Sequence, residues 1–140
     1  MKKLFGLAVL SVLVMLAVPA AAQDTIKIGG VEPLSGTFKD IGERYLEGVQ
    51  YAAKVINESG GLLGKKVEVI PIDSELKPDV ATRKAQNLIL RDGVKFFCGG
   101  TGSSVGAAMA QLAEKQNVIM FTYGMDASSM TGEKCNKNFF

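Results

Sequence analysis

The chain alternates between short apolar runs and longer segments in which apolar residues recur every three or four positions. Four short runs have the length and the β-branched and aromatic composition of strands; they are residues 25–31 (TIKIGGV), 66–72 (KVEVIPI), 94–98 and 117–122 (NVIMFT). Three longer segments predict helices over residues 43–59, 78–92 and 103–116. Strands that alternate with helices are typical of an α/β fold, here a parallel sheet with helices on both faces.

The predicted helices have apolar faces and recognisable ends. Glycines follow the first two, at Gly60 and Gly93, where a helix commonly stops. Ser103 or Ser104 is expected to cap the third helix, which is rich in alanine. Pro71 indicates that the second strand lies at the edge of the sheet. The predicted buried positions are Leu46, Val49, Ala53 and Ile56 in the first helix and Ala81, Ala85 and Leu88 in the second.

The N-terminus has the pattern of a secretory signal peptide. Lys2 and Lys3 precede an apolar run over residues 4–18, and three alanines end at Ala22. We expect residues 1–22 to be removed by cleavage between Ala22 and Gln23, which predicts export to the periplasm. The alternative is a membrane anchor, but the run is shorter than the ~20 residues that a spanning helix needs. No stable membrane insertion is expected after cleavage.

The composition of residues 23–140 excludes several classes of function. With Lys2 and Lys3 removed, fourteen basic and fourteen acidic side chains remain, so no nucleic-acid partner is expected. The chain has no histidine, which excludes the usual Ser-His-Asp and Cys-His pairs and most zinc sites. We therefore expect no catalytic residues, no metal and no cofactor. Cys98 and Cys135 could form a bridge or remain free, and Cys98 has the surroundings of a core residue.

A ligand site is expected where the parallel strands end. In open parallel sheets, ligands bind beyond the carboxyl ends of the strands. Three loops follow such ends, over residues 32–42, 99–104 and 123–129. The second loop, GGTGSS, would place backbone N–H groups and the hydroxyls of Ser103 and Ser104 at a helix start, which suits a carboxylate or phosphate. The alternative is a tight turn followed by an ordinary serine cap.

The same glycines also permit a dinucleotide-binding hypothesis. Gly100, Gly102 and Gly106 approximate the glycine fingerprint of such folds, and Asp126 lies twenty residues beyond, near the place of a ribose-binding acid. However, that fingerprint normally follows the first strand, whereas this one follows the third. An exported protein would also meet no nicotinamide pool. A nicotinamide-dependent oxidoreductase is therefore kept only as the lesser alternative, and the chain is expected not to be an enzyme.

Three stretches of the chain resemble a known family in their order and spacing. IKIGGVEPLSGTFKDIG, GVQYAAKVINESGGLLGKKVEVIPID and DGVKFFCGGTGSSVGAAMAQLAEKQNVIMFT are similar to the first lobe of periplasmic substrate-binding proteins of ABC transporters, in the leucine/isoleucine/valine-binding, type I branch. The resemblance covers residues 25–140. It implies that residues 23–140 form an N-terminal lobe that is incomplete, because MTGEKCNKNFF at the end is similar to a segment that continues into further structure. Such proteins are usually monomers that close on a ligand and dock on a membrane permease.

The resemblance also implies a set of ligand-binding residues. Ser103, with Gly102 beside it, corresponds to the positions that hold a ligand carboxylate, and Gly124 to the carbonyl that meets the ligand amine. We include Thr101 of the same loop among the candidates. Two candidates depart from the family pattern: Asp126 stands where a hydroxyl residue is usual, and Ile41 where an aromatic residue often packs on the ligand.

These departures bear on which ligand is bound. Asp126 in the cleft would repel a carboxylate and accept hydrogen bonds from an amine, amide or hydroxyl; alternatively it points away and caps a turn. Cysteines that some members pair in this lobe correspond to Leu76 and Gly102 here, so that disulfide is absent. Glu32 and Asp73, near strand ends, are expected to be solvated.

The resulting hypothesis is an extracytoplasmic solute-binding component that captures a branched-chain amino acid or a related small organic or amide ligand. The other alternative is the ligand-sensing domain of a membrane receptor with the same fold. Such a receptor would share this lobe and would continue into a transmembrane segment beyond its second lobe.

Overall fold

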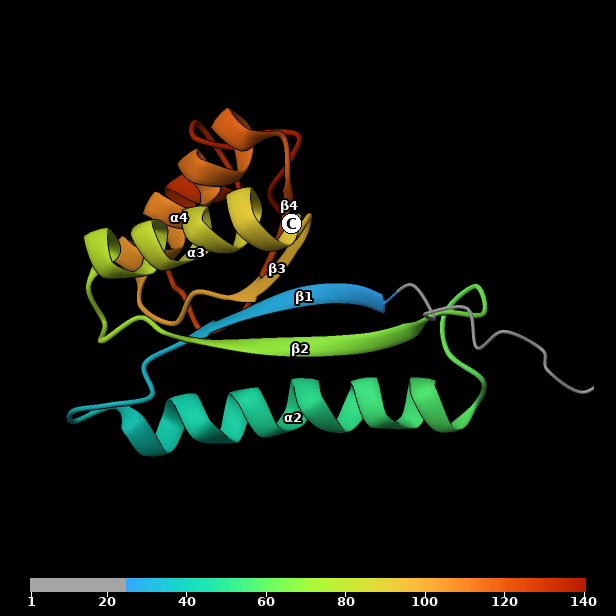
Figure 1. Ribbon diagram of the computed structural model, residues 1–140. Coiled ribbons are helices and arrows are strands. Elements are labelled where there is room, and N and C mark those ends of the chain that lie inside the picture. Colours follow the sequence, from blue (N-terminus) through green and yellow to red (C-terminus); the bar gives the residue numbers. More distant parts are fainter. Residues whose placement is uncertain (1–24) are drawn as a thin grey trace, which may run out of the picture.

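The structure, a computed structural model, describes residues 25–140. Four parallel strands form one sheet in the order β2-β1-β3-β4; they are β1 (Thr25–Glu32), β2 (Lys66–Asp73), β3 (Phe96–Gly99) and β4 (Ile119–Thr122). The helix α2 (Lys39–Glu58) covers one face, and α3 (Pro78–Asp92) and α4 (Ser103–Gln116) lie together on the other (Figure 1). A short 3-10 helix, η2 (Ser128–Met130), follows β4. The predicted α/β architecture with helices on both faces is confirmed.

The predicted signal peptide and its cleavage site lie outside the described residues. Within residues 25–140, no helix combines the length and the apolar composition that crossing a membrane requires.

Glycines in the central strand allow side chains to pack closely on both faces of the sheet. A side chain at Gly29 would collide with the ring of Phe97, and one at Gly30 would come within 2.8 Å of Leu46. Phe97 is fully buried on the face covered by α3 and α4, and Leu46 reaches the sheet from α2. Burying a side chain of this size contributes about 1.5–3 kcal/mol to stability.

The main core lies between the sheet and the pair α3 and α4. Small residues on both helices bring them close to the strands, and the larger side chains of the strands fill the remaining space. The fully or almost fully buried members include Val31, Ala81, Ala85, Phe97, Val105, Met109, Ala110 and Met120. Ala81 and Ala85 were predicted as buried, whereas Leu88 is only partly buried.

Several element boundaries differ from the prediction for local reasons. The helix α2 begins four residues early, because the chain turns at Gly36 (φ 73°) and the N–H of Lys39 donates to its carbonyl over 3.2 Å. At the other end of α2, Ile56 is exposed, which corrects its predicted burial. Asn57 takes the inward place, where its side chain donates to the carbonyl of Val67 (2.8 Å) and accepts from the Val67 N–H (2.7 Å).

The predicted serine cap of α4 is wrong. The N-cap residue is Gly102, whose φ of 92° favours glycine, and no side chain caps the helix. Ser103 is instead the first helical residue. The predicted end of the helix near Gln116 is confirmed, and Asn117 follows in the left-handed conformation.

The edge strand β2 and the start of β3 are close to their predicted positions. Pro71 is exposed on β2, which is an edge strand as expected. β3 lies two residues later at its start than predicted. Cys98 is buried and Cys135 is exposed, and both are free. Beyond η2, the chain returns to the sheet, where the N–H of Phe140 donates to the carbonyl of Met120 (2.9 Å).

Two glycines of α2 provide a matched test of how the helix is held. A side chain at Gly42 would collide with the carbonyl oxygen of Pro33, whereas one at Gly48 would meet nothing within 4 Å. We expect Gly42→Ala to lower the free energy of unfolding by about 1–3 kcal/mol. Gly48→Ala is expected to raise it by about 0.5–1 kcal/mol, because alanine loses less backbone entropy in a helix. Urea unfolding followed by circular dichroism measures both, and equal effects would contradict the assigned contact.

Candidate functional site

The loops that follow β1, β3 and β4 meet at one end of the sheet, as the topology predicted. The N–H of Gly100 donates to the carbonyl of Val31 (2.7 Å), which joins the second loop to β1. The N–H of Gly102 donates to the carbonyl of Gly124 (3.1 Å), which joins the second loop to the third. These bonds connect backbone segments that are far apart along the chain and fix them in a common arrangement.

The loop after β3 depends on glycine conformation. Gly99, Gly100 and Gly102 all have positive φ values, of 104°, 84° and 92°. Such values let the chain turn sharply from the buried strand into α4. The turn leaves Ser103 exposed at the start of the helix.

Ser103 and Asp126, both candidate ligand-binding residues, are in contact. The N–H of Asp126 donates to the hydroxyl oxygen of Ser103 over 3.4 Å. Asp126 is exposed, and its carboxylate forms no ion pair and caps no turn among residues 25–140. Ser103 therefore retains its hydroxyl proton for donation, beside a carboxylate that is free to accept.

Gly124 and Gly102 are adjacent, but their polar groups are partly occupied. The N–H of Gly102 is already donated to the Gly124 carbonyl. The carbonyl oxygen has a second lone pair, and Gly124 is exposed. Consequently, the N–H groups without a backbone acceptor at the start of α4 include those of Ser103 and Ser104 but not that of Gly102.

The remaining candidates occupy different environments. Ile41 lies in the first turn of α2 and is 46% exposed. Thr101 is buried, and its hydroxyl donates to Oε2 of Glu32 over 2.5 Å. Thr101 thus supports the loop from beneath and does not present its hydroxyl to solvent.

Glu32 was expected to be solvated, and this expectation is wrong. It is the last residue of β1, and none of its surface is exposed. Glycine at position 99 makes room for it, since a side chain there would lie 2.5 Å from Oε1 of Glu32. Burial raises the pKa of Glu32 to about 7, although the hydrogen bond from Thr101 and the nearby hydroxyl of Tyr123 oppose the shift.

Two further titratable residues face this carboxyl. Burial, and then the nearby Glu32, raises the pKa of the Cys98 thiol to about 11. Burial, with Cys98 and Glu32 close by, also raises the pKa of the Tyr123 hydroxyl far above its usual range. Neither Tyr123 Oη nor Glu32 Oε1 reaches good hydrogen-bond geometry with a partner. Glu32, Thr101, Tyr123 and Cys98 are hereafter called the carboxyl cluster.

Asp73 has a structural role at the end of β2. Its Oδ1 accepts the N–H groups of Leu34 and Glu75, each over 2.9 Å. Partial burial alone would raise the pKa of Asp73, but these donors, together with Ser35 and the charge of Lys84, lower it. Asp73 therefore joins the loops after β1 and β2 and is only partly solvated, which corrects the expectation for this residue.

The two positions that carry cysteine in some family members are neighbours here. A side chain at Gly102 would lie 2.9 Å from Cδ1 of Leu76. Leu76 adopts a positive φ of 54° and its N–H donates to Ser74 Oγ (3.2 Å). The side chain of Leu76 thus occupies the space that a side chain at position 102 would need.

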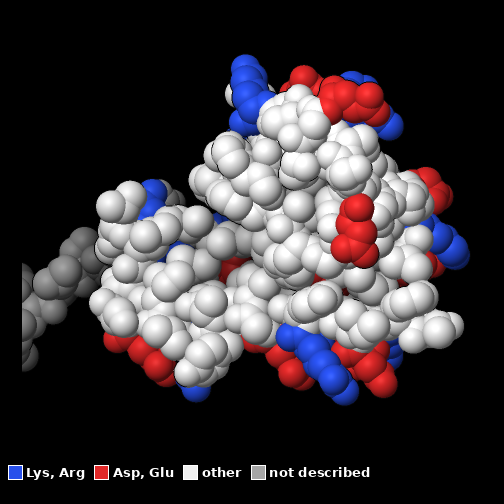
Figure 2. All heavy atoms as spheres, turned by 180° about the vertical axis from the view of Figure 1, so that it is seen from behind, with Lys and Arg blue, Asp and Glu red and all other residues white. Residues whose placement is uncertain are grey.

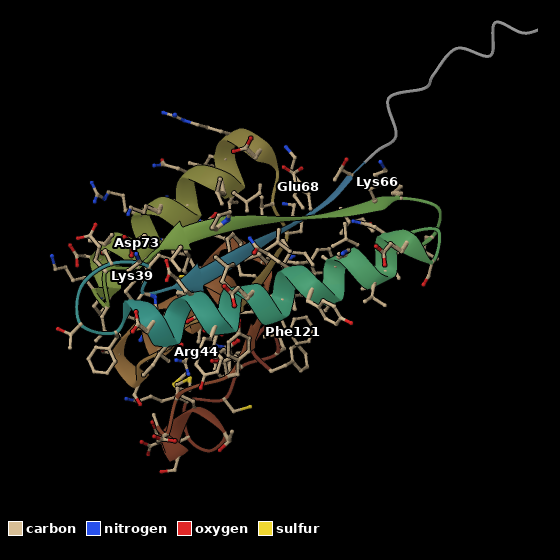
Figure 3. The ribbon with its side chains drawn as sticks, turned by 90° about the horizontal axis from the view of Figure 1, so that it is seen from below. Lys39, Arg44, Lys66, Glu68, Asp73 and Phe121 are labelled. Atoms are coloured by element: carbon tan, nitrogen blue, oxygen red, sulfur yellow. The ribbon has the colours of Figure 1, made fainter. Side chains whose placement is uncertain are left out.

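An apolar groove of about 720 Å³ lies between α2 and the sheet. Its lining includes Ile28, Tyr45, Phe96, Phe121 and, at one end, Cys98 and Tyr123 of the carboxyl cluster. Viewed from below, Phe121 and Arg44 lie on one side of α2, and Lys66 and Glu68 on the other (Figure 3). Seen from behind, the middle of the molecule carries few charged side chains (Figure 2).

Within residues 25–140, no three His, Cys, Asp or Glu side chains are grouped so that they could hold a metal ion. The polar groups at the loops include hydroxyls, backbone amides, carbonyls and the exposed carboxylate of Asp126. Such groups suit recognition of a small polar molecule by hydrogen bonds.

Comparisons with known proteins agree with this arrangement. Residues 25–140 match the model of a family described as periplasmic binding protein. The leucine-, isoleucine-, valine-, threonine- and alanine-binding protein of Pseudomonas aeruginosa is 33% identical over 110 residues, which are 79% of this chain and 29% of that protein.

Two solved structures are also similar. The branched-chain amino acid transporter substrate-binding protein LivJ of Streptococcus pneumoniae, in complex with isoleucine, has a TM-score of 0.76 and 28% identity, and the match covers 84% of this chain and 33% of LivJ. A solute-binding protein of Rhodopseudomonas palustris, in complex with 3,4-dihydroxybenzoic acid, has a TM-score of 0.70 and 28% identity, over 82% of this chain and 31% of that one.

The chain spans 29% to 33% of the length of these three relatives. The matched proteins bind substrates and are not enzymes, in contrast to the oxidoreductase alternative. Both the parallel sheet with its order of elements and the sequence matches indicate the family of the chain. The chain belongs to the periplasmic binding protein family, in its type I, leucine/isoleucine/valine-binding branch.

Proposed function

We propose that this chain forms the first lobe of the extracytoplasmic solute-binding component of an ABC transporter. The component is exported to the periplasm, acts as a monomer and delivers its ligand to a membrane permease. Its ligand is a branched-chain amino acid or a related small organic acid or amide. The supporting observation is the joining of the loops after β3 and β4, through Gly102 with Gly124 and Ser103 with Asp126.

A carboxylate fits best at the start of α4. The hydroxyl of Ser103 and the N–H groups of Ser103 and Ser104 are available as donors there. The partial positive charge of the helix N-terminus adds to their attraction for an anion. The ligands of LivJ and of the R. palustris protein, isoleucine and 3,4-dihydroxybenzoic acid, both carry a carboxyl group beside an apolar body.

A second polar contact comes from the loop after β4. The carbonyl of Gly124 and the carboxylate of Asp126 are both acceptors, and both are exposed. An ammonium group would be attracted by this pair, whereas a ligand with an acidic group alone would meet the negative charge of Asp126. Ile41, in the first turn of α2, offers an apolar contact for the body of the ligand.

The first test concerns Ser103 in the complete polypeptide. We expect Ser103→Ala to weaken binding by about 1–3 kcal/mol, because a hydrogen bond to a charged group is lost. Calorimetry with L-leucine, L-isoleucine, L-valine and 3,4-dihydroxybenzoate measures the change. Ser59→Ala is the matched control, since its hydroxyl bonds to the Val55 carbonyl at the far end of α2. Unchanged affinity in Ser103→Ala would remove this residue from the site, and no binding of any of the four probes by the unmodified protein would contradict the proposed ligand class.

A second test asks which ligands Asp126 favours. Asp126→Asn removes a negative charge from beside Ser103 without changing the size of the side chain. We expect about three- to tenfold tighter binding of 3,4-dihydroxybenzoate and weaker binding of L-leucine, because Coulomb forces at short range have this magnitude near a protein surface. Glu133→Gln removes an exposed carboxylate elsewhere and serves as the control. Equal changes for both probes would place the Asp126 side chain outside the cleft.

A further inference from the structure

Glu32 connects the ends of three strands. Its backbone carbonyl accepts the N–H of Ser74, just beyond β2, over 2.8 Å. Its side chain accepts the hydroxyl of Thr101, beyond β3. The Tyr123 hydroxyl, beyond β4, lies close enough to the carboxyl to affect its pKa. A single residue thus contacts each segment from which the neighbouring loops begin.

Thr101 connects Glu32 to the backbone of Gly102 and Gly124, which are candidate ligand-binding residues. It lies between Gly100 and Gly102, and its Oγ1 would be 3.1 Å from a side chain at Gly124. Thr101 is therefore packed between Glu32 and Gly124. Any displacement of Thr101 would move the Gly102 N–H and Gly124 carbonyl pair, and Ser103 follows directly.

The carboxyl is buried without a cation beside it. The titratable or charged groups around it are Asp73 opposite it on β2, Cys98 on β3, Tyr123 after β4, and Arg44 and Tyr45 of α2, which line the adjoining groove. Asp73 is engaged by backbone N–H groups, and Arg44 forms no ion pair with Glu32 in the described residues. The hydroxyl of Thr101 is hydrogen-bonded to the Glu32 carboxyl, and the hydroxyl of Tyr123 lies close to it without a hydrogen bond of good geometry.

We infer that Glu32 is a positioning residue for ligand binding, which holds the 100–102 loop and Gly124 in their receptive arrangement through Thr101 and Tyr123. This inference rests on the proposed function. A neutral carboxyl suits the role, because its Oε2 accepts the hydroxyl of Thr101 without placing a charge in the protein interior.

The protonation of Glu32 makes the stability of the fold and the binding of ligand depend on pH. The pKa of Glu32 is raised to about 7 in the folded chain, above its ordinary value of 4.5. The folded state therefore binds the proton more tightly than the unfolded state, and its stability falls as pH rises from about 4.5 to about 7. A ligand carboxylate at Ser103 would favour the neutral form further, so ligand binding should be accompanied by proton uptake near pH 7.

The first experiment needs no ligand. In the complete polypeptide, the amide resonances of residues 99–103 and of Gly124 are followed by NMR from pH 5 to 9. We expect them to titrate together with a midpoint near 7, and we expect Glu32→Gln to abolish this titration. Glu68→Gln, which changes an exposed carboxylate on β2, is the matched control. Loop amides that do not respond to pH, or respond equally in Glu32→Gln, would overturn the inference.

A second variant serves if Glu32→Gln fails to fold. Thr101→Val keeps the shape of the side chain but removes the hydrogen bond that lowers the pKa of Glu32. The titration midpoint of the loop amides should then move upward. A midpoint that stays unchanged would show that Thr101 does not connect Glu32 to the loop.

Ligand binding is measured separately by calorimetry with L-leucine and 3,4-dihydroxybenzoate, in two buffers of different ionisation enthalpy. We expect affinity to fall about three- to tenfold from pH 6 to 8.5, which corresponds to a ligand-induced rise of about half to one pKa unit in Glu32. Glu32→Gln should show neither this fall nor proton uptake. Affinity that rises with pH, or proton uptake that persists in the variant, would overturn the inference. Absence of binding by the unmodified protein, with the loop titration intact, would count against the proposed ligands and not against the role of Glu32.

Discussion

The pairing of β1 with strands on both sides is the constraint on which the rest of the structure depends. β1 is in register with β2 along its whole length, from Thr25 with Lys66 to Glu32 with Asp73, and with β3 from Ile28 to Val31. Because all these pairs are parallel, the strands end at the same edge of the sheet. The loops that carry the candidate ligand-binding residues therefore start from neighbouring points, although they are far apart in sequence.

Glycines in and beside β1 allow other side chains to pack closely against the paired strands. Gly29 leaves space for Phe97 on one face of the sheet, Gly30 for Leu46 on the other, and Gly99 for the Glu32 carboxyl at the end of β1. A side chain at any of these three glycines would push apart the groups that pack there. The precision of the site is thus linked to the same central strand that organises the core, and changes in packing around β1 would be transmitted to the loops.

Periodicity was sufficient to predict the alternation of strands and helices, and Pro71 to predict the edge position of β2. These features depend on local composition, such as the alanines of α3 and Pro71. The capping of α4 and the burial of Ile56 could not be predicted in this way. Gly102 becomes the cap because the loop turns with positive φ, and Asn57 replaces Ile56 inward because its amide matches the backbone of Val67. The cap of α4 is determined by the loop before the helix, and the inward position of Asn57 by the backbone of β2 at Val67.

Part of the candidate ligand-binding site could be predicted from the sequence, and part of it could not. The resemblance to a family placed Ser103, Gly102, Gly124 and Asp126 in one region, and the structure brings these residues together. The resemblance did not predict that Glu32 is buried. Its position near a strand end led instead to the expectation that it is solvated. Its burial is decided by Thr101, which is 69 residues later in the chain, and by Tyr123. An apolar residue in its place would leave the Thr101 hydroxyl without its partner, at about 1–3 kcal/mol. The carboxyl and the hydroxyls therefore account for one another: each would be unfavourable in the interior alone, and together they join the strands beneath the loops.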